Sequence, residues 1–122
     1  MNTMPVGMRF DQRNIVIIPV IFPDQSGVKI RPALVLSCDI FNHNRRKPDI
    51  ICCSITSNLN QFPHAVRLEM KDMEAGNIKY ESMIKPNVLL TIDKTLIEKS
   101  VGKIREEKFE EVILELKRIF GL

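Results

Sequence analysis

Residues 14–37 read NIVIIPVIFPDQSGVKIRPALVLS, in which two apolar runs rich in β-branched side chains flank a polar segment. Side chains of this kind favour strands. The polar segment at residues 23–27, PDQSG, consists of residue types that are common in turns. We therefore expect a strand over residues 14–22, a polar loop over residues 23–27, and a second strand over residues 30–37.

Two prolines constrain these strands. Pro19 stands inside the first run, and because proline has no N–H to donate to a sheet, it predicts an edge or a bulge at that point. Pro32 lies near the start of the second run and disfavours helical backbone at the preceding residue. Arg31 is therefore expected to have an extended backbone.

Three further strands are expected downstream. Residues 49–56 contain the run IICC, which indicates burial on both faces. Residues 65–70 alternate apolar and charged side chains, as is typical of a half-buried strand. Residues 82–91 form another strand, with a bulge expected at Pro86. A basic, polar connection over residues 42–48 precedes the strand at 49–56.

The C-terminal segment has a helical period instead. Glutamates are concentrated at its start and basic residues at its end, as the helix dipole favours. Gly121 is suited to the C-terminal end of the helix, whereas Arg105 is a poor N-cap. We expect this helix to pack on the sheet rather than to bind a partner. The result is a mostly β (α+β) domain, a small antiparallel β-barrel closed by a C-terminal helix. The apolar side chains that recur at spacings of three and four residues are Phe109, Val112, Ile113, Leu116, Ile119 and Phe120.

Composition indicates one packed domain over residues 1–122. Isoleucine, valine, leucine and phenylalanine supply 41 of the 122 residues, well above the ~20% below which disorder is expected. The apolar runs are too short for a membrane span, which needs ~20 residues, and the first residues lack the pattern of a secretory signal. Cys38, Cys52 and Cys53 show no zinc spacing and are expected to be buried free thiols of a cytoplasmic protein.

The net charge of +3 arises in the first half of the chain. Residues 1–60 carry seven basic and four acidic side chains, whereas residues 61–122 carry eleven of each. An excess this small suits an enzyme that acts on a short anionic substrate better than a protein that coats long duplex DNA.

Common catalytic and cofactor motifs are missing from the sequence. It contains no G-x-S-x-G and no glycine-rich phosphate loop. His43 and His64 have no partners at the spacing of metal ligands. No metal or cofactor is therefore expected, and periodicity alone predicts only a small cytoplasmic barrel.

Several segments together resemble the PemK/MazF-like toxins. None of them is specific alone, but their order and spacing are kept over residues 13–120, and Ser82 also matches a family serine. The segments are the strand, glycine-containing loop and Arg-Pro of residues 14–37, then Phe41-Asn42, residues 54–57 (SITS), and residues 91–94 (TIDK) leading to residues 101–104 (VGKI).

The resemblance implies a barrel related to SH3 folds, usually a homodimer, that acts as the toxin of a toxin–antitoxin pair. Its usual activity is metal-independent cleavage of single-stranded RNA at a short sequence. The expected partner is a cognate antitoxin with an acidic, partly disordered segment that competes for the basic groove. The chain departs from the family at Arg13-Asn14, where Gly-Asp is common, and at residues 85–88, KPNV, which lack a glutamine found in some members.

The resemblance places catalysis at Arg31 and Thr56. RNA can be cut without a metal because its own 2′-hydroxyl attacks the adjacent phosphorus. Arg31 offers a planar, permanently charged, two-pronged donor that would stabilise the charge on the phosphoryl oxygens and deliver a proton. The hydroxyl of Thr56, held at the end of a strand, would orient the 2′-hydroxyl or the phosphate.

RNA contacts are expected around these two residues. Four side chains are predicted to bind RNA, namely Lys29, Ser57, Asn58 and Ser82. The basic loop at residues 45–47 is expected to be mainly solvated. His64 is a further candidate for the general acid or base, without support from the family.

Two other functions stay open at this point. The related CcdB toxins share the barrel but poison gyrase through the C-terminal helix, without cutting RNA. This chain ends in residues 118–122, RIFGL, instead of their Trp-Gly-Ile ending. The other alternative is a non-catalytic barrel that binds RNA or protein.

Overall fold

The computed structural model describes residues 10–21, 24, 27–44, 46 and 49–122. Its first half contains β1 (Asn14–Ile21), β2 (Val28–Val35), α1 (Asp39–Asn42), β3 (Asp49–Thr56) and β4 (Val66–Leu68). Its second half contains the 3₁₀ turn η2 (Met70–Asp72), β5 (Met73–Gly76), β6 (Ser82–Asp93), the 3₁₀ turn η3 (Lys94–Leu96), β7 (Lys99–Ile104) and α2 (Glu106–Phe120).

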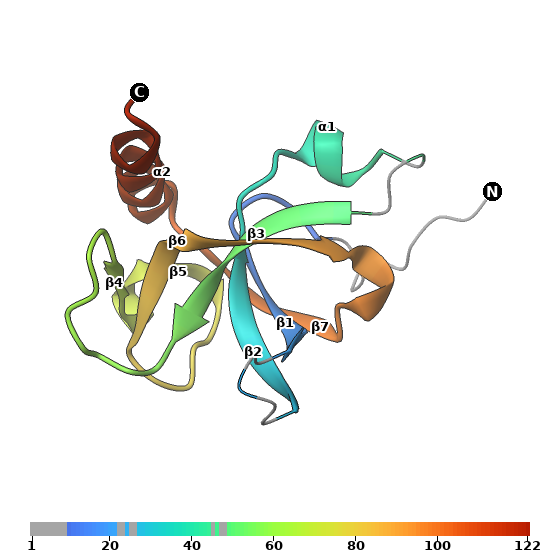
Figure 1. The fold of residues 1–122 in the computed structure, drawn as a ribbon, viewed down its shortest axis with the longest axis horizontal. Helices are drawn as coiled ribbons and strands as arrows, with labels where there is room; N and C mark the ends of the chain where they lie inside the picture. The colour runs from blue at the N-terminus through green and yellow to red at the C-terminus, as the bar shows by residue number, and fades with distance from the viewer. Residues whose placement is uncertain (1–9, 22–23, 25–26, 45, 47–48) are drawn as a thin grey trace.

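The strands of the described residues form one antiparallel sheet with the order β4-β6-β3-β2-β1-β7-β5. The sheet curls into a half-barrel (Figure 1). Its two edge strands, β4 and β5, are neighbours in the sequence and are joined by η2. The mostly β fold with a C-terminal helix is thus confirmed, with the sheet left open between β4 and β5.

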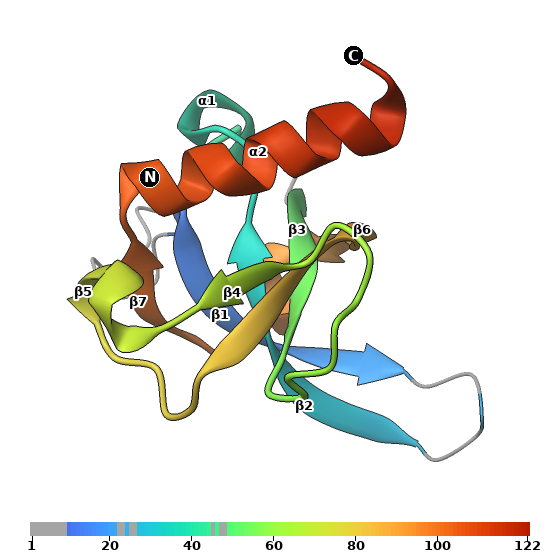
Figure 2. The same ribbon diagram turned by 90° about the vertical axis from the view of Figure 1, so that its left-hand side faces the viewer.

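The core is divided between the two faces of the curled sheet. One cluster contains Ile15, Leu34 and Ile84, and α2 packs against it through Val112 and Phe109. Figure 2 shows α2 lying across the sheet in this way, so the helix packs on the sheet as the apolar period predicts. The second cluster, on the other face, contains Phe10, Val16, Ile18, Ala33, Val35, Ile50, Cys52, Ile92 and Ile97.

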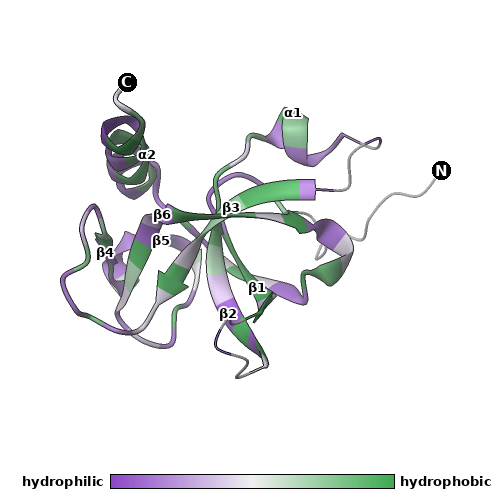
Figure 3. Ribbon diagram, viewed as in Figure 1, coloured by the Kyte–Doolittle hydropathy of each residue, from purple (hydrophilic) through white to green (hydrophobic). Residues whose placement is uncertain are grey.

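Strand β3 shows why the IICC run has no polar face. Adjacent strand residues point to opposite faces, and here Cys52 joins one cluster while Cys53 joins the other. Figure 3 accordingly shows β3 as hydrophobic over most of its length. Both thiols are free and buried as predicted, but the same prediction is wrong for Cys38, which is exposed. Cys38 immediately precedes α1, in the connection after β2, and so falls outside the sheet.

Most strand boundaries follow the predictions. β3 has the predicted bounds, and β1 begins at the predicted residue. β2 is shifted by two residues toward the N-terminus, and β4 is shorter than residues 65–70 because η2 begins at Met70. β6 runs two residues beyond the predicted end, to Asp93. Phe22 and most of the predicted loop at residues 23–27 lie outside the described residues.

Apart from the 3₁₀ turns η2 and η3, three elements were not predicted: α1, β5 and β7. α1 is a single turn whose Asn42 is buried and donates to the Ser37 carbonyl at 2.8 Å, so the polar connection predicted from residue 42 begins inside a packed element. β5 and β7 carry glycines in place of a clear alternation of apolar and polar side chains. A Cβ at Gly76 would lie 2.2 Å from the Val101 carbonyl oxygen, so this glycine permits the close pairing of β5 with β7.

The prolines stand where a pairing is interrupted. The β1–β7 pairing ends at Ile17, two residues before Pro19. In β6 the pairing with β3 jumps from Lys85 to Leu89 across the Cys53/Ser54 step, which confirms the bulge expected at Pro86. The β2–β3 pairing ends at Ala33, next to Pro32.

Arg13 occupies a left-handed conformation with φ 77. A non-glycine residue in this region costs ~1–2 kcal/mol, which explains why glycine is suited to this position. Here the side chain adds contacts that glycine cannot make. Its guanidinium donates to Glu74 at 3.1 Å and to the Ile104 carbonyl at 2.9 Å, and therefore ties the start of β1 to β5 and β7.

Among the described residues, no helix is long and apolar enough to cross a membrane.

Candidate active site

A cavity of about 650 Å³ opens where β2 and β3 separate. The two strands pair from Val35–Cys52 to Ala33–Ser54 and then diverge (Figure 1). Pro32 stands at the end of this pairing and cannot donate an N–H to extend it. Arg31 on β2 and Thr56 on β3 both line the cavity beyond this point.

Five of the six residues predicted for the site line this one cavity. They are Arg31, Thr56, Ser57, Asn58 and Ser82. The sixth, Lys29, is an exposed residue of β2 opposite Val20 and is not among the residues that line the cavity. Residues as distant in sequence as 31 and 82 therefore line the same cavity. The role of each side chain stays a prediction.

The cavity is positively charged at its rim and apolar beneath. Its charged lining side chains, among the described residues, are Arg31, Lys79 and Lys99, and all three are basic. An anion that enters it therefore meets positive charge on several sides. The apolar part of the lining is supplied by Ile15, Ile17, Ile30, Pro32, Ile55, Leu68, Ile78 and Val101.

Thr56 is oriented by a turn that follows β3. Its hydroxyl oxygen accepts a hydrogen bond from the Asn58 backbone N–H at 3.1 Å, and the Asn58 side chain in turn accepts from the Asn60 N–H at 3.0 Å. The next part of the loop is held by Lys85 of β6, whose ammonium lies 4.2 Å from the centre of the Phe62 ring. Together these contacts give the loop that follows β3 a defined path beside the cavity.

Arg31 projects from the exposed part of β2. One of its guanidinium N–H groups donates to the Ile30 carbonyl at 3.1 Å. A guanidinium carries five N–H donors in a planar fork that matches the oxygens of a phosphate group. Arg31 lies beyond the last pair between β2 and β3, and this position brings its guanidinium to the cavity.

Ser82 is buried, and its hydroxyl donates to the Tyr80 carbonyl at 2.9 Å. This contact fixes the connection that enters β6. Ser82 thus has a structural role that the sequence did not reveal, in addition to its place in the cavity lining.

Sequence reasoning missed four lining residues with polar or aromatic side chains, namely Asn77, Lys79, Tyr80 and Lys99. Lys79 and Tyr80 lie in the connection between β5 and β6, and Lys99 begins β7. Since β5 and β7 were not predicted, these residues had no position relative to Arg31. The one available signal was the adjacent basic and aromatic pair Lys79-Tyr80, because this pattern is common in nucleic-acid binding.

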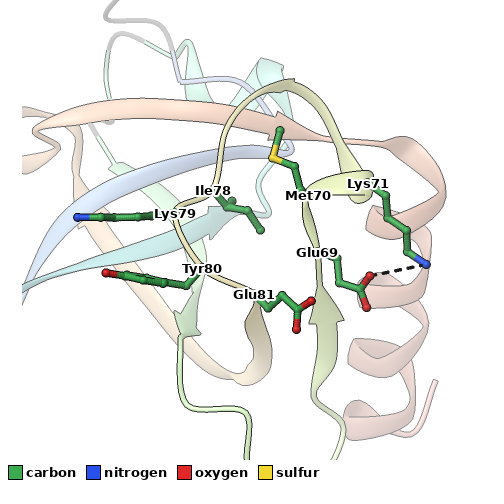
Figure 4. Close-up of a pocket in the computed structure, with 7 residues that line it drawn as sticks. All are labelled: Glu69, Met70, Lys71, Ile78, Lys79, Tyr80 and Glu81. Carbon is green, nitrogen blue, oxygen red and sulfur yellow. Dashed lines mark ion pairs between the residues drawn. The ribbon is translucent and has the colours of Figure 1, made fainter.

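A second cavity, of about 290 Å³, is also lined by the connection between β5 and β6. It is lined by Glu69, Met70, Lys71, Ile78, Lys79, Tyr80 and Glu81 (Figure 4). Ile78, Lys79 and Tyr80 line both cavities, so the two spaces are neighbours.

His64 lies elsewhere, with its Nδ1 2.9 Å from the Glu115 carboxylate on α2, and it does not line the cavity. The geometry therefore gives no support to His64 as the general acid or base. Within the described part of the chain, no three His, Cys, Asp or Glu side chains are grouped so that they could hold a metal ion. Two residues of the basic loop at 45–47, residues 45 and 47, lie outside the described residues, while Arg46 is exposed.

Comparison with known proteins gives one family match, and no curated protein matches the chain in sequence. Residues 11–120 match the sequence model of the PemK-like, MazF-like toxin of type II toxin–antitoxin systems. This match extends over nearly the whole chain and therefore includes every residue of both cavities.

Solved structures share the fold at low sequence identity. A MazE–MazF complex from Deinococcus radiodurans has a TM-score of 0.73 and 22% identity, covering 93% of this chain and 98% of that one. An endoribonuclease in complex with its cognate antitoxin, from mycobacterial species, has a TM-score of 0.70 and 14% identity, covering 93% and 95%. The Mycobacterium tuberculosis toxin MazF-mt6 has a TM-score of 0.70 and 18% identity, covering 90% and 98%.

Proposed function

Because the chain belongs to the PemK-like, MazF-like toxins of type II toxin–antitoxin systems, we propose that it is an endoribonuclease that cleaves single-stranded RNA at a short sequence without a metal ion. A cognate antitoxin neutralises it. The observation that carries this proposal is the cavity at the end of the β2–β3 pairing, which Arg31 and Thr56 both line and whose charged lining residues are basic. The names of the similar structures, which include endoribonucleases and antitoxin complexes, agree with it.

The reaction uses a nucleophile that RNA itself provides. The 2′-hydroxyl gives its proton to a general base, a role to which no side chain is assigned, and its oxygen forms a bond to the adjacent phosphorus while the bond from phosphorus to the 5′-oxygen breaks. The leaving 5′-oxygen takes up a proton. The products are a 2′,3′-cyclic phosphate and a 5′-hydroxyl end, and the negative charge on the phosphoryl oxygens increases on the way.

Arg31 is the group proposed to stabilise this charge. Its guanidinium binds two phosphoryl oxygens at once and stays charged at any working pH. A donor aimed at developing charge contributes ~2.7–4 kcal/mol to transition-state stabilisation. Arg31 is also proposed to deliver the proton that the leaving 5′-oxygen takes up, and its guanidinium regains a proton from water, so that it is charged before and after the step.

Thr56 is proposed to donate to the phosphate or the 2′-hydroxyl. Its hydroxyl oxygen already accepts from the Asn58 N–H, which favours donation of its hydrogen to the substrate. Ser57 and Asn58 follow it along the same wall of the cavity and are proposed to contact RNA. Lys29 is proposed to contact the phosphate backbone of the RNA just outside the cavity. Ser82, which is buried in the cavity lining, is proposed to contact the RNA from below.

The proposed partner and assembly follow from the family. The basic rim attracts an acidic segment of the antitoxin as it attracts RNA, so the antitoxin excludes the substrate by occupying the same cavity. The protein is proposed to be a homodimer, which light scattering on the purified protein tests directly. A monomer at micromolar concentration would contradict the dimer without affecting the cleavage chemistry.

The test of the activity is the chemistry of the RNA ends. Purified protein is incubated with a long, unstructured RNA in EDTA, and the fragments are mapped and their ends analysed. The proposal expects cuts at one short sequence, 5′-hydroxyl ends that a polynucleotide kinase can label directly, and cyclic phosphates at the other ends. Binding of RNA without any cut would identify a non-catalytic binding barrel instead.

A further inference from the structure

Tyr80 belongs to the lining of both cavities and is open to solvent. Its exposed fraction is 61%. It is also the single tyrosine of a chain that has no tryptophan. A large aromatic ring in this position needs an explanation, because exposed rings beside basic cavities are the usual stacking surfaces for unpaired bases.

Lys79 accompanies the ring. In Figure 4 the side chains of Lys79 and Tyr80 lie alongside one another and point the same way, which is away from Met70 and Lys71. The Lys79 ammonium is 5.7 Å from the centre of the Tyr80 ring. A base and the phosphate beside it therefore find an aromatic face and a positive charge next to each other.

The segment that carries Tyr80 is held in place by two contacts of the residues that follow it. The Ser82 hydroxyl binds the Tyr80 carbonyl at 2.9 Å. The next residue, Glu81, forms an ion pair with Arg67 of β4. Because the segment is ordered before RNA arrives, stacking on it costs little conformational entropy.

The acidic residues of the second cavity do not exclude RNA. Glu81 and Glu69 both contact Arg67, the second at 3.2 Å, and Glu69 also lies 3.8 Å from Lys71. Their charges are thus offset by adjacent basic groups. The strand of RNA can continue from the basic cavity past Tyr80 without meeting an uncompensated carboxylate there.

We propose that Tyr80 is the stacking platform for the base of the nucleotide next to the scissile phosphate, and that Lys79 binds the phosphate of that nucleotide. The inference rests on the proposed RNA cleavage and adds a nucleotide subsite to it. Every base has a face that can stack, so Tyr80 contributes to affinity and to the register of the strand rather than to the choice of bases.

The probe for the test is a labelled, mixed-sequence 2′-O-methyl RNA oligonucleotide, which lacks the attacking 2′-hydroxyl and stays intact. Anisotropy of the label reports binding, and intrinsic tyrosine emission, corrected for absorption by the oligonucleotide, reports on Tyr80 alone. The wild type is expected to bind with quenched tyrosine emission. Tyr80→Ala is expected to bind roughly 5- to 150-fold more weakly, the loss typical of one stacked base.

Two variants serve as controls. Tyr80→Phe keeps the ring and is expected to bind as tightly as the wild type. Phe120→Ala removes an aromatic ring of nearly equal exposure, 60%, at the end of α2, and is expected to have no effect on binding. In the cleavage assay, Tyr80→Ala is expected to raise KM while kcat and the cleaved sequence stay unchanged.

The outcomes separate the subsite from the activity. If the oligonucleotide binds the wild type and Tyr80→Ala equally well, and tyrosine emission does not change, the stacking platform is refuted while the cleavage proposal stands. If the wild type neither binds the oligonucleotide nor cuts RNA, the proposed function and the subsite are both refuted.

Discussion

The Thr56 hydroxyl oxygen accepts a hydrogen bond from the backbone N–H of Asn58 at 3.1 Å, at the point where β3 ends beside the larger cavity. A hydroxyl has one hydrogen to donate and accepts through its lone pairs. The contact with Asn58 engages a lone pair and so favours donation toward the cavity. Thr56 is thereby suited to hold a phosphoryl or 2′ oxygen rather than to act as a base.

Thr56→Val tests this role, because valine keeps the shape of threonine and lacks the hydroxyl. We expect the cleavage rate to fall by ~10²–10³-fold, the usual loss for one fixed donor at developing charge. Thr56→Ser restores a hydroxyl at the same position and is expected to recover most of the rate. Cleavage by the valine variant at the wild-type rate would remove Thr56 from the mechanism.

Lys79 and Lys99 are expected to act through charge alone. Each phosphate contact in a single-stranded complex contributes ~0.7 to the slope of log K against log salt. Lys79→Ala and Lys99→Ala should each reduce the slope by about that amount and weaken binding of all RNA sequences alike. Lys117→Ala, an exposed change on α2, serves as the control and should leave the slope unchanged. Slopes equal to the wild type in both cavity variants would show that neither lysine contacts a phosphate.

The fold could be predicted from the sequence where side-chain periodicity was strong. The alternation around residues 65–70 and the helical period of residues 106–120 both report burial on one face, and each corresponds to an observed element. β7 escaped detection because Gly102 is held there by close backbone approach to β5, where a Cβ would lie 2.5 Å from the Ala75 carbonyl oxygen. Such a contact between chain-distant segments leaves no period in the sequence.

The residues of the site also divide into those that the sequence indicated and those that it did not. Arg31 and Thr56 belong to strands with clear patterns, β2 and β3, and the resemblance to a family located them. Lys79 and Tyr80 lie on a connection whose position depends on β5. The Ser82 hydroxyl holds that connection by donating to the Tyr80 backbone carbonyl. These contacts arise only once the sheet has curled, so no local pattern indicated them.

The three cysteines are expected to react unequally. Burial raises the pKa of the Cys52 thiol to about 12, and burial beside Cys52 raises that of Cys53 as well. Since the thiolate is the reactive form, both should resist iodoacetamide in the folded protein at neutral pH, whereas the exposed Cys38 should react. Mass spectrometry should find one adduct before unfolding and three after it. Rapid labelling of Cys52 or Cys53 in the folded protein would contradict the packing described for β3.

His64→Ala is expected to leave cleavage and its pH dependence unchanged, because His64 pairs with Glu115 on α2 and lies outside the cavity lining. The hydrogen bond from His64 lowers the pKa of the Glu115 carboxyl. A lowered pKa means that this contact stabilises the fold above the ordinary pKa of a glutamate and is lost as the pH falls through the lowered value. The variant should therefore unfold at a lower temperature than the wild type near neutral pH, and the difference between the two unfolding temperatures should diminish in acid. A loss of cleavage with unchanged RNA binding would instead make His64 part of the reaction.

The most direct test of the account is cleavage of a long, unstructured RNA in EDTA by the wild type and by Arg31→Ala, read by sequencing of the 5′ ends. Arg118→Ala, which removes the same charge from the exposed end of α2, is the matched control. We expect the wild type and the control to cut at one short sequence and Arg31→Ala to make almost no cuts, with its free energy of unfolding within ~0.5 kcal/mol of the wild type. Cleavage by Arg31→Ala at the wild-type rate, or activity that EDTA abolishes and a divalent metal restores, would contradict the proposed mechanism.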